Sequence, residues 1–190
     1  MALSTRRLVK CAILAALYCA LTIACAPISY GLVQFRISEV FCILPFFTPW
    51  TVWGLYVGCM LSNLFTSANI LLDVIFGSLA TLLAGLCTAY FGRTYRRRGV
   101  FSWHSRILAC LMPVLFNGLI IGAIWAATTM STAPLANTFL LSMLIAGGTV
   151  ALGEFAVMFL LGLPVISLLP RTRILRLLND NSDQCYRAQP

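Results

Sequence analysis

Residues 8–39, LVKCAILAALYCALTIACAPISYGLVQFRISE, place a polar segment directly after a long apolar run. The apolar run from Leu8 to Ile28 is about as long as the ~20 helical residues that cross a bilayer. The polar segment from Tyr30 to Glu39 then joins this run to the next apolar stretch. The pattern predicts a helix that crosses a membrane, followed by a segment that forms the mouth of a site.

The composition of the whole chain places it in a membrane. Hydrophobic residues make up 61% of the 190 residues and charged residues make up 9%, whereas a soluble domain carries about 25% charged residues. The apolar runs are continuous rather than alternating, which argues against a β-barrel. We therefore expect an all-α integral membrane protein that forms one compact helical domain.

The apolar runs predict six membrane spans. They cover residues 8–28, 38–47, 50–65, 70–92, 105–126 and 135–169. The second and third can also be interpreted as one kinked segment, which would leave five spans. The sixth must be tilted, extended or broken, because ~35 residues at about 1.5 Å each exceed a ~30 Å core. Gly147-Gly148, Gly153 and Gly162-Leu163-Pro164 offer places to bend.

The basic residues favour six spans over five. Lys and Arg total 13, and an even number of spans leaves only Arg36 outside, with both termini and the Arg93–Arg106 loop in the cytoplasm. Five spans would split the basic clusters across the membrane, against the positive-inside bias. The net charge of +8 then reflects this bias rather than binding to nucleic acid. We expect a cell-membrane protein with a six-helix domain at residues 1–173 and a polar cytoplasmic tail at residues 174–190.

Polar side chains within the apolar stretches predict a binding site, because such groups are costly in lipid and usually mark a ligand or ion path. We expect a cavity open to the outside that is formed by Gln34, Arg36, Glu39, Asn63, Asn69 and Asp73, with Asn117 and Glu154 approaching from below. The flat walls would come from Tyr30, Phe35, Trp53 and Trp125. Structural roles stay open for some of these residues: an ion pair between Arg36 and Glu39, a helix N-terminal acid at Asp73, and interfacial belts for the aromatic residues.

Small residues recur four apart on several predicted helices, which permits close helix approach in lipid. On the first helix they are Ala12, Ala16 and Ala20, and the sequence does not decide between internal packing and a partner surface. The other faces are Gly54/Gly58/Ser62, Gly77/Thr81/Gly85 and Gly118/Gly122/Ala126. For these three we expect ordinary packing inside the bundle.

Enzyme motifs are missing from the sequence, including Gly-x-Ser-x-Gly, His-Glu-x-x-His and a phosphate-binding loop. The eight cysteines form no Cys-x-x-Cys pair, and the single histidine is His104. We therefore predict no catalytic residue, no metal site and no cofactor. ATP-driven transport would need separate ATPase subunits.

Several motifs resemble the QueT family, whose members are S components of energy-coupling-factor (ECF) transporters assigned to queuosine precursors. The motifs are Tyr30-Gly31-x-x-Gln34-Phe35-Arg36-Ile37-Ser38-Glu39, Leu44-Pro45, Asp73-x-x-Phe76-Gly77-Ser78-Leu79-Ala80-Thr81-Leu82 and Gly153-Glu154. The resemblance extends from about Leu8 to Leu169, and the tail after Arg173 lies outside it.

The resemblance implies a six-helix S-component bundle that binds its ligand from outside and topples in the membrane to release it. The implied ligand is a 7-deazaguanine-type queuosine precursor or queuine, and the implied partners are a transmembrane T subunit and two cytoplasmic ATPases. An Ala-x-x-x-Ala face on the first helix of such proteins contacts the T subunit, and Ala12, Ala16 and Ala20 match it by position. The acidic residues of the chain are compatible with this ligand, because one carboxylate can accept hydrogen bonds from the adjacent N–H groups of a guanine-like edge.

Two other functions stay open from the residues alone. In one, the chain is a stand-alone secondary transporter in which Asp73 or Glu154 carries protons or sodium. In the other, it is a membrane enzyme or assembly factor, and the lack of a catalytic constellation argues against this.

Overall fold

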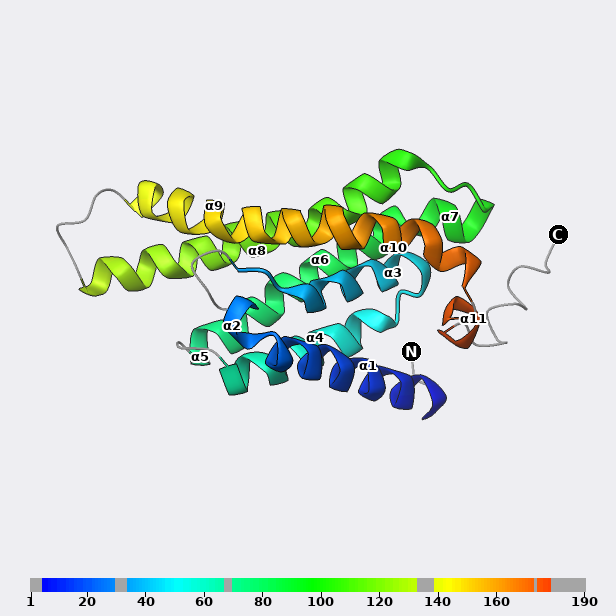
Figure 1. Ribbon diagram of the computed structural model, residues 1–190, viewed down its shortest axis with the longest axis horizontal. Helices are drawn as coiled ribbons and strands as arrows, with labels where there is room; N and C mark the ends of the chain where they lie inside the picture. Colours follow the sequence, from blue (N-terminus) through cyan, green and yellow to red (C-terminus); the bar gives the residue numbers. More distant parts are fainter. Residues whose placement is uncertain (1–4, 30–33, 67–69, 133–138, 173, 179–190) are drawn as a thin grey trace.

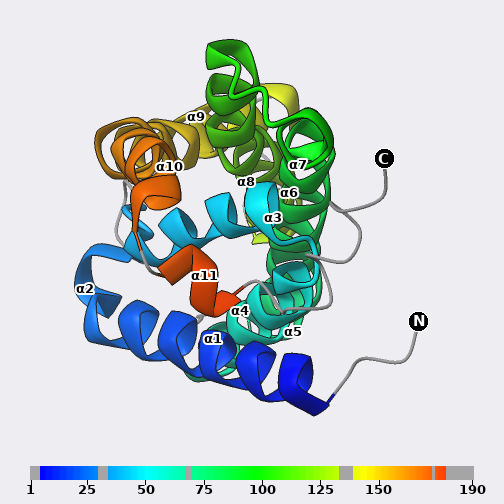
Figure 2. The ribbon, with the colours of Figure 1, turned by 90° about the vertical axis from the view of Figure 1, so that its right-hand side faces the viewer.

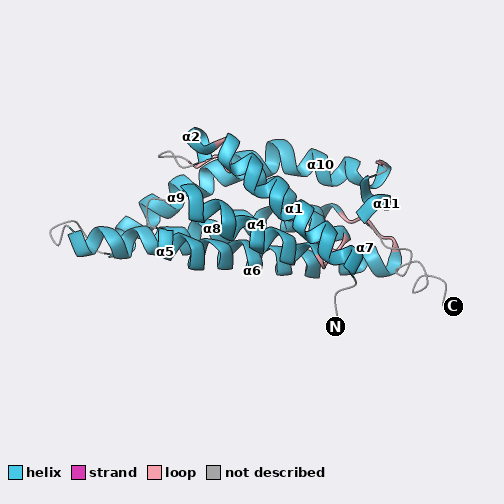
Figure 3. Cartoon of the chain, turned by 90° about the horizontal axis from the view of Figure 1, so that it is seen from below, coloured by secondary structure: helices cyan, strands magenta, loops and turns pink. Residues whose placement is uncertain are grey.

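The computed structural model of the chain describes residues 5–29, 34–66, 70–132, 139–172 and 174–178. Within these ranges all regular structure is helical (Figure 3). The helices along the first half of the chain are α1 (Thr5–Ala24), α2 (Ala26–Ser29), the 3-10 helix η1 (Ile37–Ile43), α3 (Leu44–Phe47), α4 (Thr51–Thr66), α5 (Ile70–Leu72), the π-helix η2 (Asp73–Gly77) and α6 (Ser78–Phe91). They are followed by α7 (Arg93–Arg98), α8 (Trp103–Thr132), α9 (Phe139–Val157), the π-helix η3 (Met158–Gly162), α10 (Leu163–Leu168), η4 (Leu169–Arg171) and α11 (Ile174–Leu178).

The long helices lie side by side along the long axis of the molecule (Figure 1). Helix α1 packs on α4, α4 on α6, α6 on α8, and α8 on α9. The short η1–α3 helix lies in the middle of this arrangement (Figure 2), where it contacts α1, α6, α8 and η3. Its residues Cys42, Ile43 and Phe46 are fully buried, so this helix forms the core of the bundle.

Four helical stretches among the described residues are long and apolar enough to cross a membrane. They are Thr5–Ala24, Ile70–Arg98, Trp103–Thr128 and Phe139–Arg171. Two shorter apolar helices, Ile37–Phe47 and Thr51–Phe65, coincide with the predicted second and third spans. The chain reverses between them at residues 48–50 (Figure 1), so the alternative of one kinked segment is wrong. The all-α membrane class is confirmed.

The first helix ends earlier than the apolar run predicts. Helix α1 stops at Ala24 and a short helix, α2, begins at Ala26. Pro27 explains the break, because proline lacks an N–H group and its ring clashes with the carbonyl oxygen of the residue four positions before it. The predicted single span from Leu8 to Ile28 is therefore two helices.

The fourth predicted span continues further than expected. Helix α6 ends at Phe91, and α7 follows directly after the turn at Gly92 and extends to Arg98, so the predicted basic loop from Arg93 to Arg106 is mostly helical. Helix α7 ends at Gly99, whose φ of 71° is left-handed and suits the residue after a helix. Basic side chains in the last turn also complement the helix dipole.

The sixth predicted span is one long helical stretch that changes type along its length. It is α-helical to Val157, widens to a π-helix at Met158–Gly162, and is α-helical again from Leu163. Pro164 lies just after the wide segment and removes one backbone donor, which a π-type segment accommodates. The expected irregularity thus falls at the Gly162-Leu163-Pro164 site.

The glycine faces pack inside the bundle, as predicted. A Cβ atom on Gly58 would come within 2.9 Å of the Ala15 carbonyl oxygen on α1. A Cβ atom on Gly122 would come within 2.7 Å of the Gly147 Cα on α9. These glycines therefore allow α4 to touch α1, and α8 to touch α9, at backbone distance.

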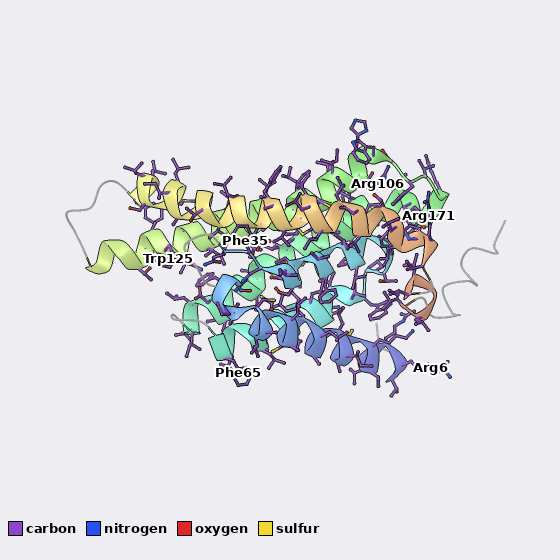
Figure 4. The ribbon with its side chains drawn as sticks, in the orientation of Figure 1. Arg6, Phe35, Phe65, Arg106, Trp125 and Arg171 are labelled. Carbon is purple, nitrogen blue, oxygen red and sulfur yellow. The ribbon has the colours of Figure 1, made fainter. Side chains whose placement is uncertain are left out.

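Basic residues gather at one end of the bundle, where Arg6, Arg106 and Arg171 lie (Figure 4). At this end Arg96 donates to the carbonyl oxygens of Phe46 at 2.6 Å, Pro45 at 3.2 Å and Ala89 at 2.6 Å. Carbonyl groups at the end of a helix have no partner within the helix. Arg96 therefore caps α3 and fixes its end against α6 and α7.

Candidate functional site

The carboxylate of Glu39 is the centre of a buried polar network. Tyr18 donates its hydroxyl to Glu39 Oε1 at 2.6 Å, and Thr81 donates to the same oxygen at 3.2 Å. The thiol of Cys42 donates to Oε2 at 2.8 Å. Glu39 is 0% exposed, so α1, η1 and α6 meet at one fully enclosed carboxylate.

Arg36 lies at the start of η1 and forms a second part of the same network. It is buried, and its Nη2 donates to Asn63 Oδ1 on α4 at 2.6 Å. Asn63 in turn donates through Nδ2 to the main-chain oxygen of Asp73 at 2.8 Å. Arg36, Asn63 and the main chain of Asp73 therefore lie next to one another, while the predicted ligand cavity stays a prediction. Asp73 lies in the first turns of its helix, so its interpretation as a helix N-terminal acid stays compatible with its position.

Glu154 and Asn117 form a pair between α9 and α8. Asn117 Nδ2 donates to Glu154 Oε1 at 2.9 Å, and both residues are 0% exposed. The remaining oxygens, Glu154 Oε2 and Asn117 Oδ1, have no hydrogen-bond partner among the described residues. Glu154 also lies within electrostatic range of Glu39 and Arg36, so the two buried glutamates share one interior region.

The extended segment that carries Gln34 rests directly on α9. A Cβ atom on Gly153 would lie 2.2 Å from the Gln34 carbonyl oxygen, so only glycine leaves room for this contact. Gln34 is buried, and its Oε1 has no hydrogen-bond partner in the described part of the chain. The Gly153-Glu154 pair thus positions both the segment and the neighbouring carboxylate.

Other predicted site residues lie outside this interior. The side chains of Phe35, Trp125 and Trp53 are 38%, 50% and 53% exposed. Figure 4 shows Trp125 towards the end of the bundle opposite to Arg6. These exposures fit interfacial aromatic residues better than walls of an interior site. Asn69 and Tyr30 lie outside the described residues.

Sequence reasoning missed the partners of Glu39. Tyr18 lies within an uninterrupted apolar run, and 21 positions separate it from Glu39. Thr81 stands in the sequence within a small-residue face and a family-like motif, and neither predicts a bond to Glu39. Cys42 follows Glu39 by three positions, and this helical spacing was the one local signal available.

The interior site offers hydrogen-bond acceptors to a ligand. The unpartnered atoms of Glu154, Asn117 and Gln34 are all oxygens, and buried oxygens without partners are costly. No group of three or more His, Cys, Asp or Glu side chains in the described ranges is placed to hold a metal ion. These oxygens suit the part of a small ligand that carries N–H groups.

A helical, apolar chain that buries carboxylates, a guanidinium and amides in its interior has the architecture of a multi-pass membrane transport protein. Comparison with known families makes this specific: the family described as QueT transporter matches residues 8–171. The chain belongs to the QueT transporter family, and it is a transporter rather than an enzyme.

A curated relative supports the same family. The protein named Queuosine precursor transporter QueT from Lactococcus lactis subsp. cremoris (strain MG1363) is 34% identical over 161 residues. The match covers 82% of this chain and 88% of that protein. No solved structure matches the chain.

Proposed function

We propose that the chain is the substrate-binding S component of an ECF importer and that it captures a 7-deazaguanine-type queuosine precursor from outside. The family and the printed name of the Lactococcus lactis relative support the substrate. The six-helix S-component architecture is part of the proposal, supported by the four long apolar helices and the two shorter ones.

The observation that carries the proposal is the set of buried oxygens without partners around Glu154. A 7-deazaguanine presents its N1–H and exocyclic amine side by side as donors. Each hydrogen bond to a charged group contributes roughly 1.5–3 kcal/mol, and several such contacts reach the roughly −12 kcal/mol of nanomolar binding. A donor-rich ring therefore complements an interior that supplies acceptors.

The exposed stripe of α1, defined as Ala12, Ala16 and Ala20, supports a partner subunit. These three alanines face outward, whereas α1 packs on α4 through its buried residues Leu14 and Ala15. Packing inside the bundle therefore does not explain the stripe. Small residues four apart permit close approach of another transmembrane helix, which fits a T subunit.

The collection of basic residues at one end supports the proposed orientation. Arg6, Arg106 and Arg171 share that end (Figure 4), together with the α7 arginines. The positive-inside bias assigns this end to the cytoplasm. The outer end is then the one that α5 and Trp125 approach.

A second function is favoured by one observation. Glu154 is an ionisable side chain buried in the middle of a long apolar helix, and such a group can also carry a proton. The alternative is a stand-alone secondary transporter. Uptake into liposomes that contain the chain without ATPase subunits would support this alternative and contradict the ECF proposal.

The direct test is calorimetry on the purified chain with a 7-deazaguanine-type precursor and no ATP. We expect binding by the wild type, and at least tenfold weaker binding by at least one of Glu39→Gln, Asp73→Asn and Glu154→Gln. The expected loss of about 2–5 kcal/mol arises because the new amide donor faces the N–H groups of the ligand. Circular dichroism checks that each variant is folded. A folded wild type that binds no deazaguanine refutes the substrate, and three variants with wild-type affinity refute the carboxylate mechanism.

A further inference from the structure

The two buried glutamates differ in how their oxygens are occupied. Both oxygens of Glu39 already accept hydrogen bonds, from Tyr18 and Thr81 on Oε1 and from Cys42 on Oε2. In Glu154 only Oε1 has a described partner, the amide of Asn117. A carboxylate can accept about four hydrogen bonds, so Glu154 retains capacity for a ligand while the protein itself occupies Glu39.

Two buried amide side chains, one bonded to Glu154 and one on the segment whose main chain rests on Gly153, also have oxygens without a described partner. Asn117 turns its NH2 group towards Glu154, which leaves its own Oδ1 without a described partner. Gln34 is held against the adjacent Gly153 through its main chain, and its Oε1 is also without a described partner. All three side chains are at least nine-tenths buried, so water competes little for these oxygens.

We infer that Glu154, assisted by Asn117 and Gln34, recognises the N1–H and 2-amino edge of a deazapurine ring. The site thereby selects 2-amino rings over rings with oxygen or hydrogen at the same position. Glu39 is a positioning residue, which joins α1, η1 and α6 and does not contact the ligand. This inference rests on the proposed function and deepens it by naming the ring edge that is recognised.

The selection follows from matching donors to acceptors. In 7-deazaguanine, N1–H and the 2-amino group both donate, and the two oxygens of a carboxylate accept both. In 7-deazahypoxanthine the second donor is missing, so one buried oxygen loses its partner. In 7-deazaxanthine a carbonyl oxygen takes the place of the amino group and faces the carboxylate, which is repulsive.

Glu154→Gln should reverse this preference. A glutamine presents one carbonyl oxygen and one NH2 group, which pair with the N1–H and the C2 carbonyl of 7-deazaxanthine. We expect the wild type to prefer 7-deazaguanine over 7-deazahypoxanthine by about 10- to 150-fold, from one hydrogen bond to a charged group. We expect Glu154→Gln to bind 7-deazaguanine at least about 30-fold more weakly and 7-deazaxanthine at least about tenfold more tightly than the wild type does.

The experiment is calorimetry with these three rings on the full-length wild type, Glu154→Gln and Glu39→Gln in nanodiscs. A reversed preference in Glu154→Gln, with the 2-amino preference kept in Glu39→Gln, supports the inference. Misfolding cannot explain this result, because a misfolded variant would not bind 7-deazaxanthine more tightly than the wild type does. An unchanged preference in Glu154→Gln overturns it, as does a reversal in Glu39→Gln. Equal affinity of the wild type for all three rings overturns the inference alone. Binding of none of them by folded wild type overturns the proposed function as well.

A conservative pair covers the case in which Glu154→Gln does not fold. Glu154→Asp keeps the charge but withdraws it by one methylene, so 7-deazaguanine should bind at least about tenfold more weakly, as expected when one charged hydrogen bond is lengthened. Glu39→Asp should lower the thermal midpoint of unfolding but keep the preference for 7-deazaguanine over 7-deazahypoxanthine, because the oxygens of Glu39 are occupied by the protein rather than by the ring. Unchanged affinity in Glu154→Asp overturns the inference.

Discussion

Replacing Gly153 by alanine should destabilise the protein and weaken ligand binding together. The added Cβ would lie 2.2 Å from the Gln34 carbonyl oxygen and 2.7 Å from its carbonyl carbon. These atoms belong to the backbone, so no side-chain rotation can relieve the clash. Residues 34–36 must shift by about 1 Å to restore van der Waals distance between the new Cβ and the Gln34 carbonyl group. Overpacking of this kind costs about 1–3 kcal/mol, which exceeds the roughly 0.5–1 kcal/mol that alanine gains over glycine in a helix.

Gly148 on the same helix provides the matched control. Nothing lies within 4 Å of a Cβ atom at this position, so Gly148→Ala should stabilise the chain by about 0.5–1 kcal/mol. Since the helical gain of alanine over glycine is common to both variants, they should differ by about 1–3 kcal/mol in the free energy of unfolding, the cost of overpacking at Gly153. Thermal and denaturant unfolding in detergent measure the difference, and calorimetry with 7-deazaguanine measures binding. If Gly153→Ala is as stable as Gly148→Ala and binds ligand normally, the contact between Gln34 and α9 is not as described.

Removal of the Tyr18 hydroxyl by Tyr18→Phe leaves a buried carboxylate oxygen with one donor fewer, and unfolding measurements should show a loss of about 1.5–3 kcal/mol. Arg96→Ala removes the cap of α3 and should cost about 1–3 kcal/mol for the carbonyl groups left unpaired; a stability equal to wild type would contradict the capping role. Ala16→Leu should leave the stability and ligand binding of the isolated chain intact but abolish transport by the assembled complex, whereas Ala15→Leu should destabilise the chain itself, because Ala15 is buried against α4. A cysteine at Gly99 should resist membrane-impermeant labelling in intact cells, and labelling there would refute the proposed orientation.

The helices are largely predictable from the sequence, because backbone groups in lipid must be satisfied within their own segment and long apolar runs therefore become helices. Helix ends are less predictable, since they depend on local chemistry within the runs. Pro27 ends α1 before the apolar run ends, and Arg93–Arg98 form a helix where their charge suggested a loop. Charged side chains at a membrane boundary can extend to water while their backbone stays helical.

The interior site is predictable only in part. The charged residues stand out because the chain contains so few of them, and the structure brings Arg36, Glu39 and Glu154 into one region. Their neutral partners do not stand out, because tyrosine and threonine are common in membrane helices. The contact between Thr81 and Glu39 spans 42 positions, and such pairs depend on how the helices pack rather than on local pattern. Trp53 and Trp125 show the converse, since aromatic residues in apolar runs fit lipid contact as well as a site.

Helix α1 carries the exposed stripe on one side and the buried Tyr18 on the other. A movement of this helix at the surface therefore also moves a side chain of the interior network. Ala16 and Tyr18 are separated by no more than the width of a helix, about 10 Å. A subunit that docks on the stripe and tilts α1 would strain the Tyr18–Glu39 hydrogen bond. Mechanical coupling of this kind would make the ligand affinity of the assembled complex differ from that of the chain alone. Equal ligand affinities of the isolated chain and of the assembled complex would show that docking on the stripe does not change the binding site.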